Sequence, residues 1–274
     1  MGTAAPVPIT FLSDYGVADD FAGVCRAVIA KLAPGARVID LTHGIRRHDV
    51  RAGSAVLADA IGYAPSGVHL AIVDPGVGGT RRPVAVRAAE AGHLFVGPDN
   101  GLLPPAIDRV GGALEAVDLE DSPLCLTPPS KTFHGRDLFA PVAAHLALGG
   151  SLADAGASID PATLERHVVS EPTLEQQRAI VHADRIDGFG NVATDLTLAA
   201  LQGHPLAGAS RVSVATRSGR RAALRAQAFD DVPEGAFLFY EDSSGRMAIA
   251  VNRGSAAEVL EIRSGEEIEL EPSP

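Results

Sequence analysis

The sequence predicts two domains, an α/β domain with a mostly parallel sheet over residues 1–165 and a smaller antiparallel β domain, a barrel or a sandwich, over residues 178–274. Strand patterns alternate with helix patterns along the first half, which is typical of a sheet covered on both faces. Val68–Val73 is an apolar run interrupted only by His69, as expected of a strand buried on both sides. After about residue 165 the apolar runs become short and turn residues separate them.

Three helices and five strands are expected in the first half. Asp19 and Asp20 stand at the N-cap of a helix pattern that begins at Phe21 and ends near Leu32, before Pro34-Gly35. The other two helix patterns run from about Asp49 to Tyr63 and from Leu138 to Leu148. The expected strands are Ile9–Ser13, Arg37–Leu41, Val68–Val73, Val84–Arg87 and His93–Val96.

Short apolar runs fill the chain from Ala179 onward. We expect them to be strands, because short strands at regular spacing are typical of all-β domains. The runs are Ile180–Ile186, Val192–Leu196, Val212–Ala215, Ala222–Ala226, Phe237–Tyr240, Met247–Val251, Val259–Ile262 and Glu267–Leu270. Ser151–Gln177 lies between the two patterns and is interpreted as the linker.

Composition excludes several classes of protein. Of 274 residues, 46% are hydrophobic and 21% charged, which is far from the composition of disordered chains. The formal net charge of −11 disfavours general nucleic-acid binding, because phosphates require a basic surface. Cys25 and Cys125 form no Cys-x-x-Cys pair, so no disulfide framework or zinc knuckle is predicted. No apolar stretch approaches the ~20 residues of a membrane span and no leader pattern is visible, so we expect a cytoplasmic protein without a membrane partner.

A glycine-rich segment, Val73–Arg82, follows the most apolar strand and contains Asp74 and Arg81. Because ligands gather at the carboxyl ends of strands in open α/β sheets, Asp74 stands where catalysis commonly occurs. The glycines do not fit the phosphate-binding patterns, since no Gly-Lys-Ser/Thr follows and the G-x-G-x-x-G spacing fails at Arg81. Taken alone, the segment slightly favours a glycine-rich turn with a solvated arginine pair.

Four further polar segments have both a functional and a structural interpretation. His134 precedes a helix and can titrate near neutral pH, but Asp137 beside it also fits an N-cap, and a lone histidine is usually a surface residue. Asp14 ends the first strand and can either cap a turn or accept both hydroxyls of a ribose. Asp187–Asn191 combines an acid, a ring and an amide that suit an adenine, or it forms a bulged turn. Asp99-Asn100-Gly101 is a strong turn signal.

In combination, these segments resemble the motifs of one family. The motifs are, in chain order, Ile9–Gly16, Asp40–His43, Val73–Gly78, Gly97–Gly101, Phe133–Asp137, Phe189–Asn191 and Ile249–Ala257. They extend over nearly the whole chain. On this ground the chain is similar to the adenosine-forming S-adenosyl-L-methionine hydrolases, formerly domain of unknown function 62, which are relatives of the fluorinase and chlorinase enzymes.

The resemblance implies a β-barrel as the second domain and a homotrimer, with each site between the first domain of one subunit and the second domain of a neighbour. It implies a catalytic set of Asp74, Arg81 and His134, and a ribose-binding carboxylate at Asp14. The residues implied to bind the rest of the substrate are Asp187, Phe189, Asn191, Ser243, Val251 and Asn252. The chemistry of the implied reaction calls for neither a metal nor a redox cofactor.

The leading hypothesis is therefore attack of water at ribose C5′ of S-adenosyl-L-methionine, giving adenosine and L-methionine. Methionine leaves as a neutral thioether, so the leaving group needs no proton. The attacking water is a weak nucleophile and needs a base, a role open to Asp74 and His134. Two alternatives are a halogenase that uses halide as the nucleophile and a non-catalytic adenosine or adenosyl-methionine binding protein. The resemblance favours the hydrolase over the halogenase, because the halogenating relatives have a tyrosine at the position of Asp74, and Gly135 lacks the hydroxyl that the fluorinase places on fluoride.

Overall fold

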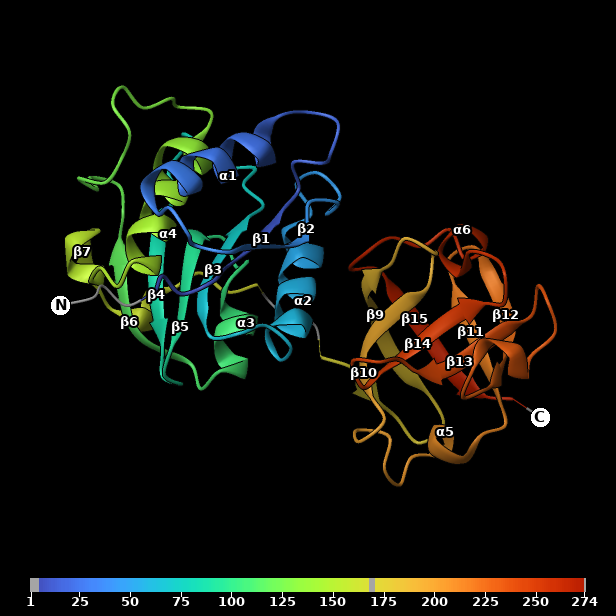
Figure 1. The fold of residues 1–274 in the computed structure, drawn as a ribbon. Helices are drawn as coiled ribbons and strands as arrows, with labels where there is room; N and C mark the ends of the chain where they lie inside the picture. The colour runs from blue at the N-terminus through green and yellow to red at the C-terminus, as the bar shows by residue number, and fades with distance from the viewer. Residues whose placement is uncertain (1–4, 168–170, 274) are drawn as a thin grey trace. The chain divides into compact units, whose positions relative to one another are not determined.

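In the computed structural model, which describes residues 5–167 and 171–273, the first half of the chain forms one seven-stranded sheet (Figure 1). Its order is β2-β1-β3-β5-β4-β6-β7. The strands are β1 (Ile9–Ser13), β2 (Val38–Thr42), β3 (Gly67–Ile72), β4 (Pro83–Ala88), β5 (His93–Pro98), β6 (Ala113–Asp118) and β7 (Ala157–Ile159). The pairings from β2 to β5 are parallel and those from β5 to β7 antiparallel, so the predicted α/β fold with a mostly parallel sheet is confirmed for the core of the sheet.

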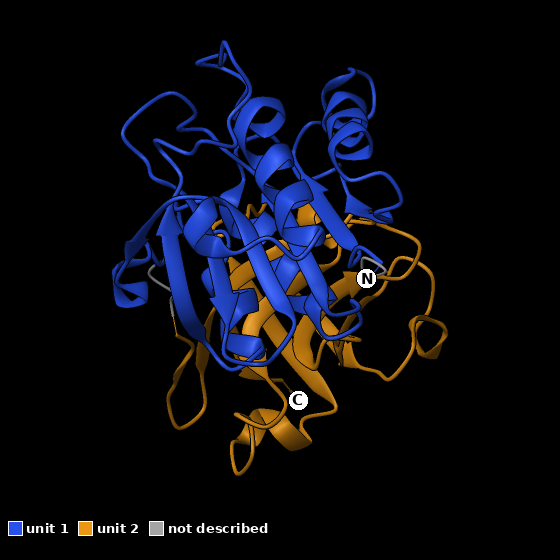
Figure 2. Ribbon diagram, turned by 60° about the vertical axis from the view of Figure 1, so that its left-hand side comes forward, with its two compact units in different colours: residues 1–167 blue, residues 168–274 orange. Residues whose placement is uncertain are grey.

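The chain divides into two units, residues 1–167 and 168–274 (Figure 2). Two segments with a sequence-based prediction lie outside the described residues. They are Met1–Ala4, where a leader would begin, and residues 168–170 of the expected linker. Among the described helices, none is long and apolar enough to cross a membrane.

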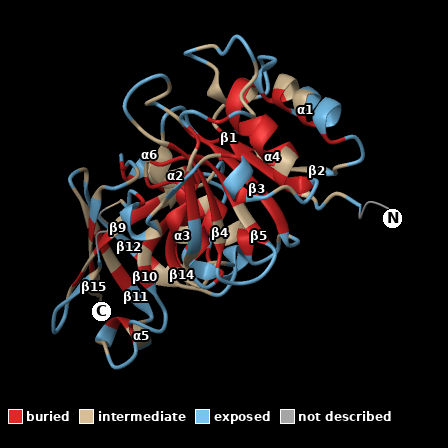
Figure 3. Ribbon diagram, turned by 90° about the vertical axis from the view of Figure 1, so that its left-hand side faces the viewer, coloured by how far each residue is buried: buried red, intermediate tan, exposed pale blue. Residues whose placement is uncertain are grey.

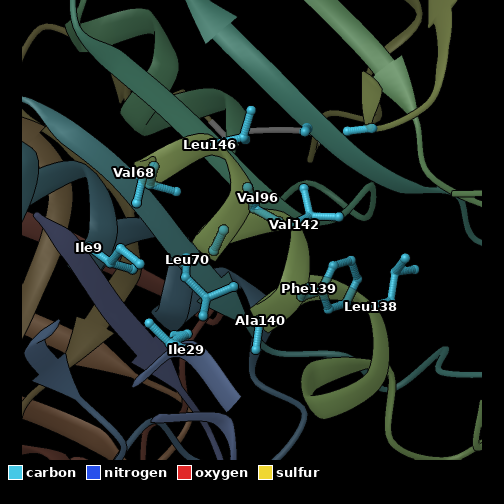
Figure 4. Packing of buried hydrophobic residues seen from close by; sticks show 14 of the residues in the cluster. Ile9, Ile29, Val68, Leu70, Val96, Leu138, Phe139, Ala140, Val142 and Leu146 are labelled. Atoms are coloured by element: carbon cyan, nitrogen blue, oxygen red, sulfur yellow. The ribbon is translucent and has the colours of Figure 1, made fainter. Parts of the chain in front are cut away.

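Helices cover both faces of the sheet in the first unit. They are α1 (Phe21–Leu32), α2 (Val50–Ile61), α3 (Pro104–Arg109), a π-helix (Gly135–Phe139) that continues as α4 (Ala140–Ala147), and two 3-10 turns (Leu152–Asp154 and Pro161–Thr163). Along β3, Val68, Leu70 and Ile72 pack with residues of α1 and α4, as Figure 4 shows for Val68 and Leu70. Ala71 and Val73 pack with residues of α2 and α3. This alternation explains why apolar residues occur on both sides of the strand, and Figure 3 shows β3 buried.

Three local predictions for the first unit are wrong. Asp137 is not an N-cap: it lies inside the π-helix, where its carboxylate accepts hydrogen bonds from the Ser130 backbone (2.7 Å) and from Arg136. The α-helix accordingly begins at Ala140 rather than Leu138. The stretch predicted as a linker is partly folded, since β7 pairs with β6 at the edge of the sheet. Each error concerns a contact that the local helix or loop pattern does not specify.

The second unit is a closed barrel, as predicted, but it is not wholly antiparallel, because β12 pairs with β13 in parallel. Its sheet order is β10-β14-β13-β12-β11-β15-β9-β8, and an additional β10–β9 pairing closes seven of these strands into a ring. The elements are β8 (Thr173–Leu174), β9 (Ala179–Ile186), β10 (Val192–Thr197), α5 (Pro205–Gly208), β11 (Arg211–Thr216), β12 (Gly219–Arg225), a 3-10 turn (Phe229–Asp231), β13 (Phe237–Glu241), β14 (Arg246–Val251), α6 (Ala256–Val259) and β15 (Glu267–Pro272).

One strand predicted for the second half, Val259–Ile262, is absent. The Ser255 hydroxyl accepts a hydrogen bond from the Glu258 backbone N–H and so caps the short helix α6, which ends at Val259. Leu260 and Ile262 follow the helix and are buried in the barrel core. Their apolar character reflects this packing and not a strand.

Candidate active site

The first group of candidate residues lies where strands β1 and β3 end. Asp14 follows β1 and Asp74 follows β3 by two residues, so adjacent parallel strands bring the two carboxylates to one edge of the sheet. Both line a cavity of about 270 Å³ together with His134. The other residues around it are Tyr15, Asp19, Phe21, Arg47, His48, Val77, Thr132, Phe133 and Gly135.

Asp74, Arg81 and His134 form one hydrogen-bonded set. Arg81 Nε donates to Asp74 Oδ1 at 2.8 Å, and a terminal guanidinium nitrogen of Arg81 donates to Asp74 Oδ2 at 2.5 Å. The same nitrogen lies 3.0 Å from His134 Nδ1. The side chains of Arg81 and Asp74 are only 10% and 6% exposed, so this ion pair is largely removed from solvent. The structure therefore brings together the three residues implied to be catalytic.

The hydrogen bond from Arg81 determines which nitrogen of His134 carries the proton. A guanidinium only donates, so Nδ1 must accept and the proton of the neutral ring must be on Nε2. Burial and the neighbouring Arg81 charge lower the pKa of His134 below its ordinary value, so the ring is neutral near pH 7. In this tautomer His134 has no free lone pair for a proton from water, and Asp74 is the available acceptor.

The loop that carries Asp74 is fixed by the Asp99-Asn100 turn. The Asn100 side-chain amide donates to the Val73 carbonyl at 2.9 Å, directly before Asp74. Asp99 is buried, accepts from Arg82 and also accepts the Glu165 backbone N–H at 2.7 Å. The turn signal read in the sequence is thus present, and its polar side chains hold the strand end.

Asp14 is held by one backbone contact. Its Oδ2 accepts the backbone N–H of His48 at 2.9 Å, and His48 adopts a left-handed conformation with φ 66°. Such a φ is uncommon outside glycine and costs free energy, so the local fold maintains it against strain. Asp14 Oδ1 makes no hydrogen bond within the described residues and is free for a ligand.

The second group of candidate residues lies in the barrel unit, around a separate cavity of about 840 Å³. All six residues implied to bind substrate there line it, namely Asp187, Phe189, Asn191, Ser243, Val251 and Asn252. Its other lining residues are Arg185, Ala193, Phe229, Asp230, Tyr240, Asp242, Ala248, Arg253, Gly254 and Ser255.

The Asp187–Asn191 turn is rigid and presents a ring. Asp187 Oδ1 accepts the backbone N–H groups of Phe189 and Asn191, each at 2.9 Å, and its Oδ2 accepts from the Asn191 amide at 2.8 Å. Gly190 has φ +81°, and a Cβ there would overlap the Ser255 hydroxyl, so only glycine fits. Phe189, at the tip, is 82% exposed. The predicted bulged turn is therefore present, and it presents the ring to the cavity, while adenine binding by this turn stays a prediction.

Several lining residues were missed by the sequence reasoning. In the barrel unit Tyr240 is one of them; burial and the charges of Asp187 and Asp242 raise its pKa to about 12, so its phenol is a neutral donor. Asn252 was identified, but its amide donates to the Val232 carbonyl at 2.8 Å and so supports the wall of the cavity. In the first unit Tyr15 was missed, although it directly follows Asp14 in the same motif.

Among the described residues, no group of three or more histidine, cysteine, aspartate or glutamate side chains is arranged to hold a metal ion.

Comparisons with known proteins cover both units. Residues 9–156 match the family model described as the SAM hydroxide adenosyltransferase N-terminal domain, and residues 181–269 match that of the C-terminal domain. The chain is 45% identical over 267 residues to a protein of Salinispora tropica named (R)-S-adenosyl-L-methionine hydrolase, covering 97% of this chain and 98% of the relative. A Thermus thermophilus protein of the same name is 39% identical and covers 96% and 99%.

A more distant relative and a solved structure also match over nearly the whole chain. A fluorinase of Nocardia brasiliensis is 26% identical, with 96% of each chain covered. The crystal structure of an uncharacterized conserved protein from Thermotoga maritima superposes with a TM-score of 0.86 at 37% identity, covering 96% of this chain and 99% of that one.

Proposed function

We infer the function from family membership: the chain belongs to the SAM hydroxide adenosyltransferase family, whose two domain models it matches in order. It hydrolyses S-adenosyl-L-methionine to adenosine and L-methionine. The observation that carries this assignment to particular residues is the buried Asp74–Arg81–His134 set in the cavity at the strand ends. Incubating the purified protein with S-adenosyl-L-methionine and measuring adenosine by chromatography tests it, and no adenosine above the no-protein control would contradict it.

In the proposed reaction a water oxygen attacks ribose C5′ while the bond from C5′ to the sulfonium sulfur breaks. The bonding pair stays on sulfur and gives methionine as a neutral thioether, so no proton is needed by the leaving group. The attacking water loses one proton. Each Asp74 oxygen accepts one N–H from Arg81 and keeps a second lone pair, so Asp74 can take that proton. A positioned base of this kind contributes roughly 10²–10⁴-fold to the rate.

Arg81 and His134 position Asp74 in this scheme. Arg81 is permanently charged and cannot be the base, but its two hydrogen bonds fix the plane of the Asp74 carboxylate. His134 accepts from the same guanidinium and so fixes Arg81 in turn. The reaction transfers no electrons and leaves a neutral thioether, so we propose that it needs neither a metal nor a cofactor. Activity that survives treatment with a chelator would support this, and activity restored only by added metal would refute it.

The proposed binding roles divide the substrate between the two cavities. Asp14 Oδ1 is free to accept hydrogen bonds from the ribose hydroxyls. In the barrel unit, the exposed Phe189 ring offers a stacking surface for adenine, and Asn191 offers an amide to its polar edge. Asp187 provides a carboxylate for the methionine ammonium. The remaining candidates, Ser243, Val251 and Asn252, complete the wall of that cavity.

We propose that the two cavities meet across subunits of a homotrimer, the first unit of one subunit against the barrel unit of its neighbour. Apolar side chains exposed at both cavities support this proposal, because grouped exposed apolar side chains, unlike single ones, mark interaction sites. At the first cavity the lining residue Phe21 is 40% exposed, and Val17, between the lining residues Tyr15 and Asp19 in the sequence, is 93% exposed. At the second cavity Phe189 is 82% and Phe229 40% exposed. We also propose a cytoplasmic location, which cell fractionation tests.

Subunit complementation tests the shared site. Asp74→Asn disables the first unit, and Ser243→Trp places a large ring in the barrel cavity at an exposed position. Each variant alone should be nearly inactive. Co-expressed chains with different tags should recover activity, because about one site in four then combines two intact halves under random assembly. Co-purified mixtures without recovered activity, or a fully active monomer, would contradict the shared site.

A further inference from the structure

We propose that Tyr15 is an additional residue of the reaction centre: its phenol hydroxyl binds the attacking water, and Gly135 is glycine because that hydroxyl occupies the space of a side chain. This inference rests on the proposed hydrolysis. Tyr15 follows Asp14, and Gly135 follows His134, so the pair lies between two residues already placed in the site. Both line the same cavity as Asp74.

The close approach of Tyr15 explains the glycine at position 135. A Cβ added to Gly135 would overlap the Tyr15 hydroxyl oxygen and lie 3.1 Å from the ring carbon that bears it. The next neighbour, Ile72 Cδ1, is 3.3 Å away, which a small shift relieves. Gly135 is helical and is not among the glycines with positive φ, so its backbone conformation does not require glycine. The constraint therefore comes from the hydroxyl of Tyr15.

Aromatic packing fixes the position of that hydroxyl. The Tyr15 ring lies 5.7 Å from the Phe21 ring and 5.9 Å, edge to face, from the Phe133 ring. Phe21 and Phe133 are themselves in edge contact at 5.0 Å. The three rings come from the loop after β1, from α1 and from the segment before the π-helix. A ring held on two sides cannot move its hydroxyl away from Gly135 without disturbing this cluster.

The Tyr15 hydroxyl has no hydrogen-bond partner among the described residues, although the ring is half-buried. A partly buried hydroxyl without a partner is unfavourable, and such groups in an active-site cavity commonly bond to a ligand or an ordered water. Burial, with further effects from Cys25, Asp74 and Asp14, raises the pKa of Tyr15 far above its ordinary value. The phenol therefore keeps its proton and acts as a donor.

A donor at this position complements Asp74. The attacking water must give a proton to a base, direct one lone pair at C5′ and satisfy its second lone pair. Asp74 takes the proton, and the Tyr15 O–H donates to the second lone pair, which fixes the orientation of the first. Tyr15 thus contributes to the orientation of the attacking water.

A double-mutant cycle tests the pair. Tyr15→Phe removes the hydroxyl and should lower kcat by about tenfold or more. The KM for S-adenosyl-L-methionine should change little, because the lost hydrogen bond is to the attacking water. Gly135→Ala should lower kcat at least as much in the wild-type background. In the Tyr15→Phe background, Gly135→Ala should cost less than about threefold, because the overlapping oxygen is gone.

Gly62→Ala and Tyr63→Phe are matched controls, since nothing lies within 4 Å of a Cβ at Gly62 and Tyr63 is 88% exposed. Melting temperatures of all variants report folding, and the Gly135→Ala loss of stability should also shrink when Tyr15 is Phe. Equal effects of Gly135→Ala in both backgrounds, or an unchanged kcat in Tyr15→Phe, would overturn the proposal. Wild-type protein that forms no adenosine would instead overturn the proposed function, and this inference with it.

Discussion

Replacing Arg81 by methionine tests whether the Asp74 carboxylate depends on its cation. Methionine keeps an unbranched side chain but removes the charge and all donors. The change deletes both hydrogen bonds to Asp74, at 2.8 and 2.5 Å, and the 3.0 Å bond to His134. Because the Asp74 side chain is only 6% exposed, water cannot replace the lost partner well.

The expected cost in unfolding free energy is about 3–5 kcal/mol, the range found when one partner of a buried ion pair is removed. Arg87→Met is the matched control. Arg87 pairs with Glu115 at 3.3 Å, and their side chains are 38% and 57% exposed, so this surface pair contributes only about 0–1 kcal/mol. Adding Asp74→Asn to Arg81→Met should return much of the stability, because a neutral amide needs no cation.

Urea unfolding followed by far-UV circular dichroism measures these differences, since the chain has no tryptophan for fluorescence. Protein concentration must be equal for all variants, because assembly shifts the apparent stability. If Arg81→Met costs no more than Arg87→Met, or if the double variant is no more stable than Arg81→Met alone, the account of the ion pair is wrong.

Three further predictions concern the site and the core. Asp74→Asn should lower turnover by at least ~10²-fold while the Kd for S-adenosyl-L-methionine, measured by calorimetry, changes little; loss of binding with intact turnover would contradict this. Phe189→Ala should raise KM by about tenfold at constant kcat through lost stacking, and unchanged initial-rate kinetics would count against it. Burial and His93 lower the pKa of His69 to about 3, so the native state stays neutral while the unfolded chain protonates near pH 6.5. Stability should therefore fall on acidification, by up to about 1.4 kcal/mol per pH unit between these values. Urea midpoints against pH should show a shallower slope in His69→Gln, and an equal slope would refute the assignment.

The sequence predicted those parts of the fold in which the residue types of a short segment directly indicate how that segment is buried. Val68–Val73 is apolar on both sides because helices cover both faces of β3, so its burial could be read directly. Asp14 and Asp74 follow adjacent strands, and parallel strands bring their ends to one edge. The sequence predicted that each carboxylate follows a strand, and the structure adds that the two strands are neighbours and that both carboxylates line one cavity.

The parts that were not predicted depend on contacts that a local pattern of residue types does not specify. Val259–Ile262 has the composition of a strand, but the Ser255 cap and the barrel core make it the end of a helix and a buried turn. Asp137 is held by Ser130 and Arg136, which removes it from the role of an N-cap. In the same way, the requirement for glycine at position 135 comes from Tyr15, far away in the sequence. Only the folded chain shows such constraints.

The central claim is that water attacks C5′ of S-adenosyl-L-methionine in this protein. Product analysis in ¹⁸O-labelled water tests it most directly, carried out separately with excess chloride and excess fluoride. The account predicts that adenosine is the only nucleoside product in every case and that its 5′ oxygen carries the label. A dominant 5′-halo-5′-deoxyadenosine product, or adenosine without label at the 5′ position, would contradict it.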